Sequence, residues 1–214
     1  MNKLRLLLML LPACLLSAKL LAADTTVLDA YLTGLETWSA DFTRTTVDAD
    51  RKPTDKERGK LLIVRPGKFR WESVPDAADE GGRLMIADGR NVWSLDRDLE
   101  TTTVRPLTEA LSQSPVMMLA GGTDLRKAFV VQSTGRREGL EWVRAQPRDP
   151  ASDFREASFG FKGRELARLV IVDKLGQRST LDFTGVKRNA AVDPALTQFV
   201  LPEGVDLIGK PVVP

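Results

Sequence analysis

Residues 68–72 read Lys68-Phe69-Arg70-Trp71-Glu72, and this short stretch decides the class of fold. Charged and aromatic side chains alternate along it. Because successive side chains of a β-strand point to opposite faces of a sheet, the alternation predicts a strand with one wet face and one apolar face. A sheet built from such strands is covered by other parts of the protein on one side only.

The same alternation recurs on both sides of this stretch, and tight-turn signals such as Pro66-Gly67, Asp88-Gly89, Lys162-Gly163 and Leu175-Gly176 separate the segments. Short strands joined by short turns are typical of an antiparallel meander that curls into a barrel. We therefore expect a mainly β fold with some helices, an incomplete antiparallel β-barrel of about 11 strands covered by short lid helices. The predicted strands are residues 40–47, 60–65, 68–74, 83–87, 91–96, 101–105, 129–131, 140–145, 154–161, 165–172, 177–184 and 199–201.

Apolar residues at helical spacing occur in two places. The first predicts an amphipathic helix over residues 26–35, behind plausible N-caps at residues 24–26. The second is the segment 107–120, where Ser114-Pro115 interrupts the pattern and Gly121-Gly122 ends it. This segment either plugs one end of the barrel or forms a movable lid, for which the adaptable side chains of Met117 and Met118 are suited.

The first 23 residues have the layout of a secretory signal peptide. Lys3 and Arg5 precede an apolar stretch over residues 6–16, and small residues gather at Ala22 and Ala23. We expect cleavage there and a single mature domain over residues 24–214. Cleavage takes away three of the 31 Lys and Arg residues and none of the 29 Asp and Glu residues, so the mature chain is close to neutral. No basic run remains that would indicate nucleic acid as a partner.

Few residues are left for catalysis. The sequence has no histidine, and its single cysteine, Cys14, lies inside the apolar stretch that cleavage removes. The commonest general base, metal ligand and nucleophile are therefore missing. Asp96, Asp98 and Glu100 could form an acidic cluster, but they lie at a predicted turn, where solvated carboxylates are common. We expect no enzyme activity, no metal and no cofactor.

The block RPGKFRW (residues 65–71), followed by Ile86-Ala87-Asp88-Gly89 and Val92-Trp93, resembles the LolA family of periplasmic lipoprotein carriers. The resemblance continues through residues 98–100, 114–115, 173–177 and 202–205. It implies an open barrel whose apolar cavity accepts the acyl chains of lipoproteins. It also implies a periplasmic carrier that takes acylated lipoproteins from an inner-membrane lipoprotein-releasing ABC transporter and passes them to an outer-membrane lipoprotein receptor. We expect a monomer.

The resemblance also implies the functional residues. Arg65 is the lid latch, whose guanidinium donates hydrogen bonds to carbonyls at the end of a lid helix when the cavity is empty. Without the resemblance, Arg65 could simply end a strand in solvent, and each apolar candidate could be ordinary core. The candidates for the cavity lining are Phe69, Trp71, Met85, Trp93, Met117, Met118, Leu119, Phe159 and Phe161.

Two departures from the family pattern and three other functions remain open. The acidic segment 76–82 and the tail 205–214 are longer than expected, and either could alter partner choice. Residues 11–14, Leu11-Pro12-Ala13-Cys14, loosely resemble a lipoprotein processing site, so the chain could be an outer-membrane receptor of the same fold anchored through Cys14. A periplasmic sensor or scaffold that binds a lipid or peptide is a second alternative, and an enzyme acting on lipids is a third.

Overall fold

The computed structural model describes residues 25–78, 81–110, 116–121 and 124–213. The predicted signal peptide, residues 1–23, and the Ser114-Pro115 interruption lie outside these ranges. The described residues form one sheet of 12 strands. The prediction of a mainly β, largely antiparallel fold with short helices is therefore confirmed. The strands are β1 (Thr37–Val47), β2 (Pro53–Val64), β3 (Lys68–Pro75), β4 (Arg83–Asp88), β5 (Asn91–Asp96), β6 (Thr101–Pro106), β7 (Phe129–Arg137), β8 (Leu140–Pro147), β9 (Phe154–Lys162), β10 (Glu165–Asp173), β11 (Arg178–Arg188) and β12 (Asp206–Ile208).

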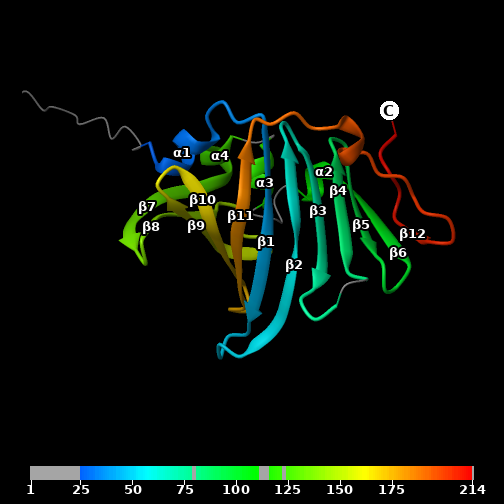
Figure 1. Cartoon of the computed structure of the whole chain (residues 1–214), viewed down its shortest axis with the longest axis horizontal. Coiled ribbons are helices and arrows are strands. Elements are labelled where there is room, and N and C mark those ends of the chain that lie inside the picture. The colour runs from blue at the N-terminus through cyan, green and yellow to red at the C-terminus, as the bar shows by residue number, and fades with distance from the viewer. Residues whose placement is uncertain (1–24, 79–80, 111–115, 122–123, 214) are drawn as a thin grey trace, which may run out of the picture.

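The strand order makes the sheet an open barrel. It runs β12-β6-β5-β4-β3-β2-β1-β11-β10-β9-β8-β7. Each neighbouring pair is antiparallel except β12 and β6, which are parallel. The pairing of β1 with β11 joins the first half of the chain to the second. In Figure 1 the sheet curves around the helices, which gather near one end of the strands.

The predicted turn at Asp88-Gly89 is present. β4 ends at Asp88 and β5 begins at Asn91, so Gly89 and Arg90 form a two-residue hairpin loop. The carboxylate of Asp88 accepts hydrogen bonds from the backbone N–H groups of Arg90 and Asn91, each at 2.8 Å. Gly89 has a φ of 99°, which a glycine adopts without strain. The turn chemistry thus fixes the register of β4 against β5.

The first helix, α1 (Val27–Leu32), is shorter than the predicted helix over residues 26–35. Thr26 caps it as expected, in a capping box in which Thr26 and Asp29 bond each other's backbone N–H. Thr33 then leaves the helical conformation, and Gly34 has a φ of 66°. Between β6 and β7, the described residues form the short helices α2 (Leu107–Ala110), α3 (Val116–Ala120) and α4 (Leu125–Ala128).

The end of the chain covers part of the outer face of the sheet. The predicted strand over residues 199–201 is wrong, because Phe199 stacks flat on Trp93 instead, with ring centroids 4.9 Å apart and planes 12° apart. A 3-10 helix, η1 (Pro194–Thr197), precedes this contact, and β12 follows it. The tail therefore buries a separate apolar cluster on the outer face, made of Ile86, Leu95 and Val104.

Candidate functional site

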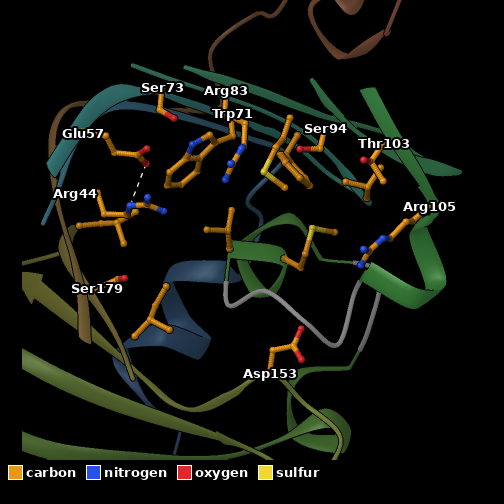
Figure 2. A pocket seen from close by; sticks show the side chains of 17 residues that line it. Arg44, Glu57, Trp71, Ser73, Arg83, Ser94, Thr103, Arg105, Asp153 and Ser179 are labelled. Carbon is orange, nitrogen blue, oxygen red and sulfur yellow. Dashed lines mark ion pairs between the residues drawn. The ribbon is translucent and has the colours of Figure 1, made fainter. Parts of the chain in front are cut away.

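An apolar cavity of about 480 Å³ lies between the concave face of the sheet and α3 (Figure 2). Every residue of α3 is buried, so this helix forms one wall. On the opposite wall the indole of Trp71 packs against Phe42, with ring centroids 4.1 Å apart. The apolar side chains that line the cavity are Phe69, Trp71, Met85, Val92, Val116, Met117, Ile171 and Leu181.

Four of the nine predicted lining residues, Phe69, Trp71, Met85 and Met117, lie at this cavity. Met118 lies on the other side of α3, where it lines a second cavity of about 500 Å³ beside Phe129. Met117 contacts both cavities, so α3 separates them.

The structure places the other four predicted lining residues away from the cavity. Leu119, Phe159 and Phe161 are in the closely packed core, and the ring of Phe161 meets Tyr31 edge-on at 5.2 Å. Trp93 lies on the outer face, because Val92 points inward and neighbouring residues of a strand point to opposite sides. Its indole N–H donates to Asp88 at 2.8 Å. Alternation predicts two faces for β5 but does not identify the concave one.

Arg65 follows β2 and meets the ends of two helices. Its Nη1 donates a hydrogen bond to the carbonyl of Leu32, the last residue of α1, at 2.7 Å. The guanidinium also lies against Gly121, where an added Cβ would be 2.6 Å from Nε of Arg65. Burial lowers the pKa of Arg65, because desolvation disfavours a charged group. This arginine thus sits between the end of α1 and the residue that follows α3.

Two further arginines, which sequence reasoning missed, hold α1. Arg126 of α4 pairs with Asp29 at 2.6 Å, and Arg188 of β11 donates to the carbonyl of Tyr31 at 2.6 Å. Burial raises the pKa of Asp29, but hydrogen bonds from Arg126 and Thr26 outweigh that effect and the pKa is lowered. The partners are 97 and 157 residues apart in sequence, so no local pattern indicates these contacts.

Polar residues line several sides of the cavity, and one charged pair lies near Trp71 (Figure 2). Nε of Arg44 is 3.0 Å from Oε1 of Glu57. Burial raises the pKa of Glu57, although the Arg44 guanidinium opposes the effect. The sequence could have indicated that both side chains point inward. Arg44 lies two residues after buried Phe42 on β1, and Glu57 lies four residues before buried Leu61 on β2, so each shares the inner face of its strand.

The acidic cluster considered from the sequence builds a turn. Oδ1 of Asp96 accepts from the backbone N–H groups of Asp98 and Leu99, each at 3.1 Å, and Asp98 accepts from the N–H of Gly82. In the part of the chain that the structure describes, no three His, Cys, Asp or Glu side chains are placed to share a metal ion. Across the same ranges, no helix has the length and apolar character needed to cross a bilayer.

An open β-barrel with an apolar cavity beneath short helices defines a class of proteins that bind apolar ligands. This chain belongs to the LolA family, since the family model described as "Outer membrane lipoprotein carrier protein LolA" matches residues 33–200. The chain is therefore an outer-membrane lipoprotein carrier, which is a transport protein and not an enzyme.

Relatives named "Outer-membrane lipoprotein carrier protein" match over nearly their whole length. The relative from Dechloromonas aromatica (strain RCB) is 32% identical over 180 residues, which cover 84% of this chain and 85% of the relative. The relative from Xanthomonas oryzae pv. oryzae (strain MAFF 311018) is 33% identical over 201 residues, 93% of this chain and 94% of the relative. The crystal structure of an uncharacterized conserved protein from Thermus thermophilus matches with a TM-score of 0.53 at 12% identity, over 85% of this chain and 96% of that one. That likeness shows a shared fold.

Proposed function

We propose that the cavity beside α3 shields the acyl chains of lipoproteins while they cross the periplasm. The observation that carries the proposal is a space of about 480 Å³ whose wall is mostly apolar and is formed on one side by a short helix. Each methylene group moved out of water contributes about 0.8 kcal/mol, so an acyl chain needs such a shelter. Phe69, Trp71, Met85 and Met117 form the lining that we assign to cargo.

The lid in this proposal is α3, and Arg65 is its latch. A carrier must release its cargo, so the closed state should be only slightly favoured over the open one. Arg65 meets this need because it holds α1 by a hydrogen bond and touches the end of α3 without an ion pair to either helix. Cargo that displaces α3 would separate Gly121 from the guanidinium.

The route in this proposal follows from the family. Lipoproteins are received from the inner-membrane lipoprotein-releasing ABC transporter and delivered to the outer-membrane lipoprotein receptor. Export would remove residues 1–23, and the carrier would act as a monomer. Mass spectrometry of the exported chain should give an N-terminus near residue 24. An acylated Cys14 would instead support the anchored receptor and would contradict a free carrier.

A transfer assay tests the latch. Inner-membrane vesicles release a purified lipoprotein to the carrier, and the soluble complex is then mixed with the receptor. Arg65→Leu should take up cargo but pass it on more slowly. Without the guanidinium, the closed, empty state of the lid is less stable, so release of the cargo is less favourable. Arg90→Leu, at an exposed arginine of the β4–β5 turn, is the matched control. Normal delivery by Arg65→Leu would remove the latch role.

A further inference from the structure

Four polar side chains form a continuous strip on the wall of the apolar cavity. They are Arg44, Glu57, Ser73 and Arg83, on the neighbouring strands β1 to β4, and we call them the polar belt. Arg44 is opposite Glu57, and Ser73 is opposite Arg83. All four line the cavity, and Figure 2 shows them around Trp71.

The apolar part of the cavity begins directly beside the polar belt. Trp71 lies two residues before Ser73 on β3, and its partner Met85 lies two residues after Arg83 on β4. Leu181 is opposite Arg44 on β11. Arg83 is half-exposed, so the belt reaches the mouth of the cavity, while Glu57 is largely covered. An amphiphile that enters past Arg83 would therefore bring its polar group onto the belt.

Each arginine of the polar belt is paired with at least one carboxylate. Nη2 of Arg44 lies 2.8 Å from Asp55 and its Nε lies 3.0 Å from Glu57, while Arg83 faces Asp96 at 3.6 Å. The belt therefore offers no unmatched positive charge to an anion.

Two atoms of the belt remain without a hydrogen bond. Nε of Arg44 and Oε1 of Glu57 are buried, and although they are close, their geometry is not that of a hydrogen bond. A buried polar atom that makes no hydrogen bond has lost the favourable free energy of its hydrogen bonds to water. A ligand that presents one acceptor and one donor at this point would recover that free energy.

We propose that the polar belt binds the neutral junction of an acylated lipoprotein, where ester and amide groups link the acyl chains to the polypeptide. A carbonyl oxygen of the junction accepts from Nε of Arg44, and an amide N–H donates to Glu57. The chains then extend past Trp71 and Met85. This inference rests on the proposed function, because it places the polar end of the same cargo.

The polar belt also explains how one cavity could reject other lipids. Fatty acids and phospholipids carry the same chains, but their carboxylate or phosphate would lie beside the Glu57 carboxylate, and the neighbouring Arg44 is already paired with Glu57 and Asp55. Like charges at such a partly buried site repel each other strongly. The belt thus selects a neutral junction over an anionic head group, by an unfavourable contact with the wrong ligand as well as by favourable ones with the right ligand.

Binding measurements on the mature chain test this inference with three probes. These are a diacylglyceryl-cysteine peptide with an N-terminal amide, its dialkyl ether analogue without ester carbonyls, and a free fatty acid of the same chain length. Arg44→Met combined with Glu57→Met should weaken binding of the diester about tenfold and binding of the ether analogue by a clearly smaller factor, because that probe keeps the amide N–H for Glu57 but has no ester carbonyl for Arg44. Glu57→Gln should increase the affinity for the fatty acid several-fold.

The matched control is Arg168→Met combined with Asp182→Met. That ion pair, at 2.6 Å, also joins neighbouring strands but lies on the outer face, so it should change none of the affinities. Equal losses for the diester and the ether would overturn the inference, because the belt would then only support the barrel wall. Unchanged diester binding in the double variant would also overturn it.

Two further outcomes separate this inference from the proposed function. If the wild-type chain binds neither diacyl probe, the cavity assignment fails and the polar belt fails with it. If the wild type binds both probes and Glu57→Gln does not bind the fatty acid more tightly, only the selectivity of the belt is refuted. Glu57→Gln is nearly isosteric, so this readout survives even if the double methionine variant does not fold.

Discussion

At the scale of single residues, Gly59 shapes the aromatic wall of the cavity. A Cβ at this position would collide with the carbonyl oxygen of Glu72 and would lie 2.8 Å from Cζ of Phe42. Because glycine leaves this space empty, the Phe42 ring can lie across β2 and reach Trp71. The lack of a side chain at Gly59 therefore allows the contact between Phe42 and Trp71.

Gly59→Ala should destabilise the fold by about 1–3 kcal/mol, because backbone and aromatic ring must move apart to admit a methyl group. Denaturant unfolding measures the change. Gly160→Ala is the control, since the atoms nearest to its Cβ would belong to the side chains of Leu140 and Trp142, at 3.0 Å, and not to the backbone. An equal effect of the two substitutions would contradict a role for the Phe42 contact.

Asp88 should make the stability of the hairpin depend on pH. Burial raises its pKa, but hydrogen bonds from Asn91, Trp93 and Arg90 outweigh burial, and the pKa is lowered from 3.8. The folded state therefore favours the charged form. Its contribution to stability is complete above the unfolded-state pKa and is lost as the pH falls through the lower folded-state pKa.

Asp88→Asn should lower the free energy of unfolding by about 1 kcal/mol at neutral pH, and the difference from wild type should shrink in acid. Urea unfolding at several pH values measures it. A difference that is the same at neutral and acid pH would show that the charge of Asp88 does not stabilise the turn.

At the scale of elements, the contact between the tail and β5 replaces a predicted strand. Phe199→Ala should destabilise the protein by about 1–3 kcal/mol, because it removes the ring that stacks on Trp93 and covers the outer cluster. Val200→Ala is the matched control, as the Val200 side chain is 83% exposed. Thermal unfolding should separate the two variants. Equal effects would mean that the tail is not held through Phe199.

Sequence periodicity located most strands through their buried positions, but it missed the first half of β2 and the second half of β7, which are largely exposed and carry no apolar alternation. It failed at residues 199–201, where Phe199 is covered by another side chain and not by strand pairing. It also missed β12, whose three residues are all exposed and carry no alternation. The helix over residues 26–35 was too long because Leu35 stays in the core after the helix has ended. Apolar spacing reports burial, and burial does not require a continuing helix.

At the scale of the whole molecule, the site depends on contacts that local patterns do not encode. Alternation placed Phe69, Trp71 and Met85 on a buried face, and the family resemblance implied a role for Arg65. The ion pair between Arg126 and Asp29 appears only when distant segments meet. Periodicity likewise could not separate the open part of the inner face from the part filled by Phe159 and Phe161, since both read as buried strand.

The open barrel leaves two sheet edges, and they are treated differently. β7 has an exposed second half that ends in Arg136 and Arg137, and charged edges resist pairing with other chains. The β6 edge is instead covered by β12, which pairs with residues 101–103. The tail is fixed further along, where Asn91 exchanges two hydrogen bonds with the backbone of Val212.

A chain that ends at Gly204 should therefore self-associate, because it keeps the Phe199 stack but frees the backbone groups of β6 and uncovers Val104. Sedimentation at increasing concentration should show oligomers that the full-length chain does not form. The truncation also removes apolar side chains of the tail. Leu207→Ser combined with Ile208→Ser removes two of these side chains but keeps the backbone of β12, so it serves as the control. This control should behave as the full-length chain does, since both side chains are exposed. If the truncated chain stays monomeric at all concentrations, β12 does not protect the edge.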